Sequence, residues 1–279
     1  MTGFWGRFSK NKGAAIGCGI FAFVLLMAIF APVIAPGDPW RMAGAPRTDA
    51  FDPAHWLGTD MLGRDVWATI VHGARVSLIV GGGATLAALL IGVTLGGFAG
   101  YCGGWVDDVL MRFTEFFQSI PSFILALLIV AIFQPSVGSI VSAVAIVSWP
   151  PVARVVRGEF LSLRNREFVQ AAVVLGQGTW RIIFGQILPN ALSPIVVLSS
   201  FMVATAILLE AALSFLGLGD PNVMSWGFMI GSGRSTIRIA WWTSVFPGVA
   251  LFLTVLSLNL IGEGISDALN PRLHDRGEA

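Results

Sequence analysis

The amino-acid sequence predicts an all-α membrane protein with six transmembrane helices, and three observations support this fold class. Of the 279 residues, 55% are hydrophobic and 12% are charged, whereas soluble domains carry about 25% charged residues. Six apolar runs each approach the roughly 20 residues that a bilayer-spanning helix needs. The runs lack the strict alternation of a β-barrel wall, so helices are expected to satisfy the backbone groups in lipid.

The first apolar run extends from Ala14 to Ala35. It follows Arg7, Lys10 and Lys12 and ends at a Pro-Gly-Asp-Pro turn that starts at Pro36. Such a run could be a cleaved signal peptide or an uncleaved anchor. The apolar part of a secretory signal has about 7–15 residues, and this run is longer, so the sequence favours the anchor.

The other five runs are separated by glycine, proline or charged clusters. They are Val76–Ala99, Val109–Phe133, Val137–Val156, Asn190–Leu213 and Val245–Ile265. We therefore expect two parts in the chain. Residues 1–75 form an anchor helix with an outer loop, and residues 76–279 form a five-helix core that contains an inner loop at 157–190.

The distribution of lysine and arginine predicts the orientation, because cytoplasmic connections carry an excess of these residues. With the N-terminus inside, the inner connections hold 11 of the 17 basic residues and the outer connections hold 6. Both termini are therefore expected in the cytoplasm. The inner set is Arg7, Lys10, Lys12, Arg112, Arg154, Arg157, Arg164, Arg166, Arg181, Arg272 and Arg276.

Two connections are too long to be simple turns, and both are expected to be ordered interaction surfaces. In the outer one, Pro36–Arg75, the stretch from His55 onward predicts a short helix along the membrane surface. In the inner one, we expect a first short helix ending near Leu175 and a second one, capped by Thr179, ending at Pro189. This inner loop could also be an amphipathic helix in the lipid headgroups.

Within the inner loop, the Gly176-Gln177-Gly178 stretch stops the first helix, and Gly176 supplies a turn suited to positive φ. The order of residues resembles the EAA loop of ATP-binding-cassette (ABC) importer permeases. In those proteins an acidic residue, two alanines, a glycine and a distal Leu-Pro mark the helix that fits a groove on the ATPase. The positions here are Gln170, Ala171, Ala172, Gly176, Leu188 and Pro189, with Gln170 in place of the acid.

Four further segments are similar to the second, C-type permease of dipeptide, oligopeptide and nickel importers. They are His55–Gly82, Tyr101–Ala126, Glu210–Ile230 and Asn259–Leu273. The resemblance implies a type I ABC importer fold and a multi-pass protein of the bacterial inner membrane. It also implies a heterodimer with a homologous permease, two cytoplasmic ATPases and an extracytoplasmic substrate-binding protein.

Motifs for chemistry within this chain are missing from the sequence. There is no GxxxxGK[ST] phosphate loop, HExxH metal motif or GxSxG elbow. His55, His72 and His274 have no metal-ligand spacing and are expected to make ordinary surface contacts. We expect no enzyme activity, no cofactor and no metal. The net charge is +1 and there is no strongly basic stretch, so we expect no nucleic-acid partner. Membrane lipid is expected to surround the spans.

Polar residues within the spans are candidates for a transport path, because they are costly in lipid. Ser199 and Glu210 share a small, polar face of the fifth span with Val203 and Ala206, and Asn259 lies in the last span. Each could instead make a helix-packing hydrogen bond. The prolines in or beside spans could be hinges or fixed bends: Pro121, Pro150, Pro151 and Pro247.

The predicted function is that of an importer subunit for peptides that works by alternating access. A binding protein delivers the substrate, and closure of the ATPases pushes on the loop at 157–190. The same family carries nickel chelates, glutathione, opines or sugars, so these remain alternative substrates. Rival hypotheses are a transporter driven by an ion gradient with Glu210 as its proton site, and a purely structural scaffold.

Overall fold

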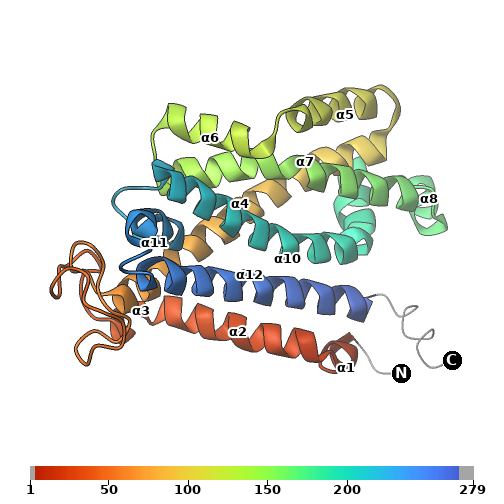
Figure 1. Cartoon of the computed structure of the whole chain (residues 1–279). Coiled ribbons are helices and arrows are strands. Elements are labelled where there is room, and N and C mark those ends of the chain that lie inside the picture. Colours follow the sequence, from red (N-terminus) through yellow and green to blue (C-terminus); the bar gives the residue numbers. More distant parts are fainter. Residues whose placement is uncertain (1–3, 270–279) are drawn as a thin grey trace.

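The computed structural model describes residues 4–269 as a bundle of helices (Figure 1). Arg272, His274 and Arg276 lie outside these described residues. The helices are α1 Phe4–Phe8, α2 Lys12–Ile29, α3 Ala31–Ile34, α4 Val66–Cys102, α5 Gly104–Ser119, α6 Ser122–Phe133, α7 Val137–Leu163, α8 Glu167–Val174, α9 Thr179–Ile182, α10 Leu188–Leu213, α11 Trp226–Gly233 and α12 Trp242–Leu269. Short π-helical turns join α9 to α10 and follow α10, so Thr179–Leu218 is continuous.

Five of the described helices are long and apolar enough to cross a membrane, namely α2, α4, α7, the continuous Thr179–Leu218 helix and α12. The α5–α6 pair makes a sixth when the two are counted as one broken span. The six predicted spans are therefore present in this form. α7 and α12 run on through their internal prolines, Pro150, Pro151 and Pro247.

Pro121, predicted to be a hinge or a fixed bend, divides the Val109–Phe133 run into two helices. α5 and α6 meet at an angle of 83°. The break lies at Ile120 and Pro121, where Ile120 is extended with φ −93° and ψ 129°. A residue before proline is pushed out of the helical region, and proline has no N–H to donate to the preceding turn. The bend therefore follows from Pro121.

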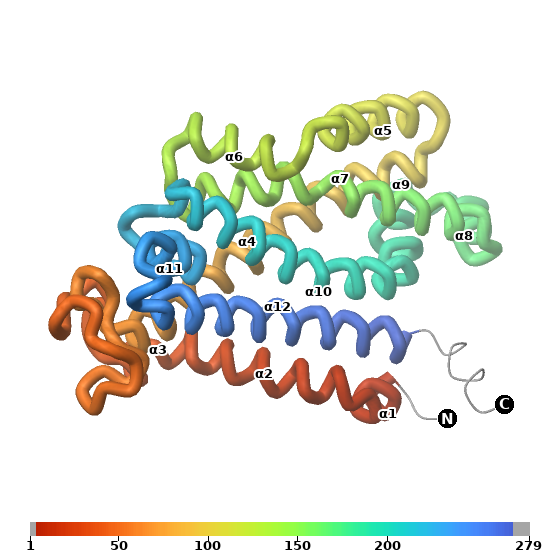
Figure 2. The backbone as a smooth tube through the Cα atoms, viewed as in Figure 1, coloured from red at the N-terminus to blue at the C-terminus, as the bar shows by residue number. Residues whose placement is uncertain are grey.

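The two ends of the bundle carry different segments. Figures 1 and 2 show α1, the last turn of α12 and α8 together at one end, which we call the α8 end. The loop between α3 and α4 and the short helix α11 lie at the opposite end, the α11 end. The first and last described helices thus start and finish on the same side, as six crossings require. The positive-inside count predicts that the α8 end is cytoplasmic.

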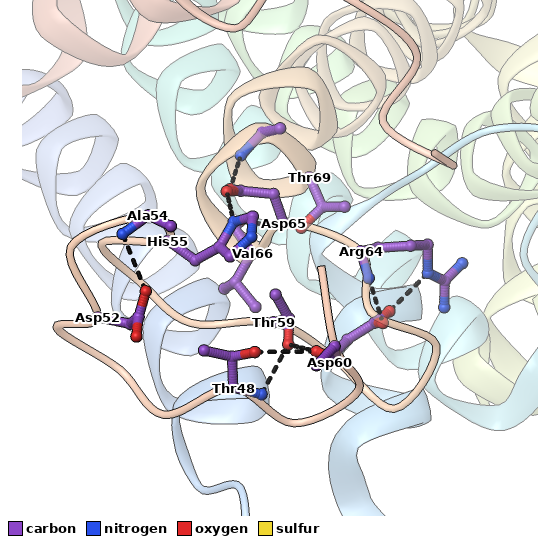
Figure 3. A network of polar contacts seen from close by, with 12 residues as sticks. Thr48, Asp52, Ala54, His55, Thr59, Asp60, Arg64, Asp65, Val66 and Thr69 are labelled. Carbon is purple, nitrogen blue, oxygen red and sulfur yellow. Dashed lines mark hydrogen bonds and ion pairs between the residues drawn. The ribbon is translucent and has the colours of Figure 1, made fainter. Parts of the chain in front are cut away.

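The predicted surface helix in the outer connection is also wrong. Residues 36–65 form a loop, and the helical part from Val66 onward is the start of α4, capped by the Asp65 carboxylate, which accepts from the Ala68 N–H at 3.0 Å. Figure 3 shows the polar network that holds this loop. His55 Nδ1 lies 2.8 Å from Asp65 Oδ2, and the Arg64 Nε donates to Asp60 Oδ2 at 2.5 Å. Backbone hydrogen bonds within the loop, such as that from the Arg47 N–H to the Asp60 carbonyl oxygen at 2.9 Å, add to these side-chain contacts, and together they replace the helical pattern.

Among the described helices, α4 and α7 have the most extensive packing interface, and glycines of α4 allow close approach there. A Cβ on Gly96 would overlap the carbonyl oxygen of Ala153, and one on Gly92 would lie 2.8 Å from the carbonyl oxygen of Trp149. Gly100 follows at the same spacing of four residues and faces the backbone of α7. Membrane helices commonly pack through small residues spaced in this way.

Candidate coupling surface and transport cavity

The inner loop contains α8 as predicted, but the second helix does not end at Pro189. It runs on through Pro189 into the fifth span, and a π-helical turn, Ile183–Ile187, lies directly before Leu188 and Pro189. Thr179 does not cap the helix: Gly178 holds the cap position and no side chain bonds there. The prediction of positive φ at Gly176 is confirmed by a value of 72°.

α8 exposes one of the two predicted alanines and buries the other. Gln170 and Ala171 are exposed, whereas Ala172 is 4% exposed and packs with Val169 in a buried apolar cluster. That cluster also holds Ile187, next to Leu188 and Pro189. Of the predicted residues, Ala172 and Leu188 therefore share one apolar cluster at the α8 end, whereas Ala171 stays accessible to a partner.

The last residue of α8 and the turn after it project large aliphatic side chains. Val174 is 86% exposed and Leu175 is 78% exposed. The N–H of Leu175 donates to Ala171 O at 3.0 Å, and the N–H of Gly176 donates to Val173 O at 2.9 Å. The prediction missed this apolar pair, although the consecutive residues Val173, Val174 and Leu175 were a signal, because a short helix cannot bury all three.

The three polar candidates of the spans occupy different environments. Glu210 is 1% exposed and accepts from Ser77 Oγ at 3.2 Å and from Ser214 Oγ at 2.7 Å, so it joins α10 to α4. Ser199 Oγ donates to the carbonyl oxygen of its own helix at Val196, at 2.7 Å. Asn259 is half-buried on α12. The fold does not bring these three side chains together.

A cavity lies beside the α5–α6 bend. It has a volume of about 630 Å³ and is bounded by α5, α6, α7 and α10. It opens to the surface, because Ser122 and Thr205 are exposed. Four polar side chains line an otherwise apolar wall, and these are Gln118, Ser122, Ser148 and Thr205. None of them was among the predicted site residues, because the sequence does not show which side chains a bend at Pro121 brings together.

The histidines among the described residues make local contacts. His55 pairs with Asp65, and His72 Nε2 lies 3.0 Å from the Ala35 carbonyl oxygen. Both lie near the α11 end, in or next to the loop at 36–65. His72 joins α4 to the end of α3, so its contact helps to place the outer loop on the bundle.

Comparison with known proteins identifies the class of this bundle. A family model described as a binding-protein-dependent transport system inner membrane component matches residues 92–275. The chain belongs to this transport-component family. A second model, the N-terminal transmembrane domain of oligopeptide transport permease C, matches residues 1–51. Together the two matches confirm the resemblance to C-type ABC permeases.

Other members of the family match nearly the whole chain. The dipeptide transport system permease protein DppC of Alkalihalophilus pseudofirmus is 44% identical and covers 96% of this chain and 88% of its own length. The glutathione transport system permease protein GsiD of Pectobacterium atrosepticum is 40% identical, over 97% and 90%. The oligopeptide transport system permease protein OppC of Bacillus subtilis is 38% identical, over 96% and 88%.

The family fold is also present in a solved structure. An inward-facing structure of the MetNI methionine ABC transporter gives a TM-score of 0.61 at 17% identity, covering 72% of this chain and 96% of that one. The chain is thus a multi-pass protein of the bacterial inner membrane with the fold of an ABC importer permease. Members of this family are transport subunits that work with a binding protein and ATPases.

Proposed function

We propose that this chain is one permease subunit of an ATP-driven peptide importer, paired with a homologous permease and two ATPases. The observation that carries the proposal is the identity of 38–44% to relatives named as dipeptide and oligopeptide permeases, over at least 95% of this chain. The likeness to the glutathione permease favours glutathione as a second candidate substrate. Glutathione is itself a small peptide, so both belong to one chemical class.

The α8 end supports the proposed contact with an ATPase. Val174 and Leu175 present exposed aliphatic surface beside Ala171, on a segment expected to lie outside the membrane. Exposed apolar surface of this kind favours burial by a partner. Ala171 has no side chain beyond Cβ, so a groove wall can approach the α8 backbone there. The proposed coupling residues are Gln170, Ala171, Ala172, Gly176, Leu188 and Pro189, with Val174 and Leu175 added.

The packing beneath α8 supports transmission of movement. Val169 and Ala172 share a buried cluster with Phe160 of α7 and Ile195 of α10. A displacement of α8 is therefore passed to two membrane helices rather than absorbed by a loose loop. ATPases that bind one arrangement of α8 more tightly shift the population toward that state, and their differential affinity sets the size of the shift.

The cavity at the α5–α6 bend is proposed as this subunit's half of the transport path. Its polar side chains can bond peptide amides, and its apolar wall can contact peptide side chains. A cavity with exposed polar groups is costly against lipid, so a second permease subunit is expected to cover it. Ser199 and Asn259 stay candidates for the path, whereas the serine contacts of Glu210 favour a helix-packing role.

Reconstitution of the assembled complex in liposomes tests the function. With the binding protein outside and ATP available to the ATPases, we expect uptake of labelled dipeptides and tripeptides that stops without ATP. A matched set of liposomes that lacks the ATPases but carries a proton gradient distinguishes this proposal from the rival hypothesis of an ion-driven transporter. Uptake in that set would contradict the proposal and favour an ion-driven transporter. Uptake that continues in complexes lacking this chain would favour a scaffold role.

A further inference from the structure

A short aromatic helix lies where the first membrane span begins. Only the turn at residues 9–11 separates α1 from α2, and α1 carries a cluster of three aromatic side chains, Phe4, Trp5 and Phe8. The rings of Phe4 and Phe8 are stacked with their centroids 6.0 Å apart, and the Trp5 ring meets both edge-on, at 5.5 and 6.4 Å. Trp5 is 77% exposed, so the cluster presents an aromatic surface away from the bundle.

Contacts with α2 and α12 hold this segment in place. A Cβ on Gly264 of α12 would overlap the Cβ of Ala14 and lie 3.3 Å from Cε2 of Phe8, so α1 packs where α2 and α12 meet. Asn11 caps α2, because its Oδ1 accepts from the Ala14 N–H at 3.0 Å, and its Nδ2 donates to Asp267 Oδ2 at 2.9 Å. The aromatic cluster therefore has a fixed position relative to the span.

The length of α2 places the aromatic cluster at the edge of the bilayer. α2 has 18 residues, which extend about 27 Å, slightly less than the hydrocarbon core of about 30 Å. Its exposed side chains are apolar and include Ile16, Phe23 and Leu26, so this side of the span suits lipid. The first turn of α2 therefore reaches the headgroup region, where tryptophan is enriched in membrane proteins.

The same segment carries surplus positive charge. Both lysines of the chain, Lys10 and Lys12, are exposed there, and Arg7 is half-buried beside them. None of the three forms an ion pair with a described residue. The neighbouring carboxylates on α12 are Asp267, which is already bonded to the cap residue of α2, and Glu263, which is exposed. Cations therefore outnumber carboxylates at this corner of the bundle.

Aromatic and basic side chains in this arrangement match an anionic membrane surface. Aromatic rings fit the boundary between headgroups and acyl chains, and lysine and arginine can lay their apolar stems along it while their charges reach the phosphates. A cytoplasmic membrane surface is negatively charged and attracts basic segments beside a span. Because α2 already holds the chain in the membrane, these residues need only select the lipids that surround them.

We propose that residues 4–12 form a binding surface for the headgroups of anionic phospholipids. Lys10 and Lys12 bind the phosphates, Arg7 adds a third positive charge, and the aromatic cluster of α1 inserts between the headgroups. Figures 1 and 2 show α1 at the α8 end, where the charge count predicts the cytoplasmic surface. The surface is distinct from α8 and from the cavity at the α5–α6 bend, so the inference does not rest on the proposed function.

Quenching by labelled lipids tests this surface in the assembled complex. Cys18 and Cys102 are replaced by alanine, and a fluorophore is attached to Ser9→Cys, in the exposed turn before α2. Vesicles contain equal amounts of phosphatidylglycerol and phosphatidylcholine, with a nitroxide on the acyl chain of one lipid or the other. We expect the labelled phosphatidylglycerol to quench about twofold more strongly. In the double variant Lys10→Gln and Lys12→Gln, the ratio should fall close to one.

Matched variants show whether the effect is local. Lys10→Arg with Lys12→Arg keeps both charges and should keep the twofold ratio. Arg41→Gln with Arg47→Gln removes two exposed charges from the outer loop and should also keep it. A fluorophore at Ala54→Cys, beside Asp52 in that loop, should show no preference for phosphatidylglycerol.

Three results would overturn the inference. The first is equal quenching of the Ser9→Cys label by the two lipids. The second is no quenching by either lipid, which would show that a protein subunit covers the segment. The third is an unchanged ratio after both lysines are replaced by glutamine. If that variant does not assemble with the ATPases, high salt applied to the unaltered lysines serves instead, because it screens exposed charges and should lower the ratio.

Discussion

At the residue scale, the turn at Gly176 depends on a backbone conformation that other residues resist. Its φ is 72°, and nothing lies within 4 Å of a Cβ built there. A side chain would therefore be opposed by backbone strain alone, about 1–2 kcal/mol. The positive φ was predictable because glycine is the residue that adopts it most easily. The inward direction of Ala172 was not, because it depends on how α8 is rotated against the bundle.

We predict that Gly176→Val disturbs coupling and that Gly178→Val does not disturb the turn. Gly178 lies two residues away, also has open space around its Cβ position, and has φ −68°, which any residue adopts. ATP-dependent peptide uptake by the reconstituted complex should fall severalfold in Gly176→Val and stay near the unaltered level in Gly178→Val. Equal effects of the two variants would show that the positive φ is not what matters.

Glu210 provides a second prediction at this scale. Its carboxylate accepts from Ser77 and Ser214 in a buried site. Glu210→Gln keeps an acceptor for the hydroxyls, so ATP-driven uptake should persist. Glu210→Leu leaves two buried hydroxyls unpaired, and we expect a loss of about 1–3 kcal/mol of stability, measured as a lower Tm in detergent. Loss of uptake in Glu210→Gln at an unchanged Tm would instead support a proton site.

At the element scale, hydropathy located the apolar spans but not their true ends. α4 extends from Val66 to Cys102, well beyond the predicted Val76–Ala99, because a helix continues into the interface where composition becomes mixed. Pro121 marked the place of the bend in the sequence, but the angle of 83° was not predictable, because it depends on how α5 and α6 each pack on α7. The spacing of Gly92, Gly96 and Gly100 was a readable signal of close helix packing that hydropathy alone does not register.

We predict that Gly96→Ala destabilises the bundle whereas Gly82→Ala does not. A Cβ on Gly96 would overlap the backbone of Ala153, and one on Gly82 in the same helix would meet nothing within 4 Å. Overpacking a tight interface costs about 1–3 kcal/mol, so the Tm of the detergent-solubilised protein should fall by several degrees in Gly96→Ala. Alanine is favoured over glycine within helices, so Gly82→Ala should keep or slightly raise the Tm. The reverse order would contradict the close packing of α4 on α7.

At the scale of the whole molecule, the fold class and the inner loop were predictable, because the apolar runs and the order of residues at 157–190 can each be recognised within short stretches of sequence. The cavity at the α5–α6 bend was not, because it is built where α5, α6, α7 and α10 meet. The orientation in the membrane is a prediction from charge. An alkaline phosphatase inserted in the loop at 36–65 should be active outside the cell, and a fluorescent protein fused after residue 279 should fluoresce in the cytoplasm. An inactive phosphatase and a fluorescent protein that stays dark would place the α8 end outside the cell, which would contradict the proposed contact between α8 and cytoplasmic ATPases.

The central claim is that the α8 end receives the ATPases. Site-specific photo-crosslinking measures this directly, with the photoreactive residue at Leu175 or, as a control of similar exposure at the α11 end, at Trp56. In the assembled complex, we predict adducts between Leu175 and an ATPase subunit, and none between Trp56 and an ATPase. A working complex in which Leu175 forms no ATPase adduct, or in which Trp56 forms one, would contradict the account.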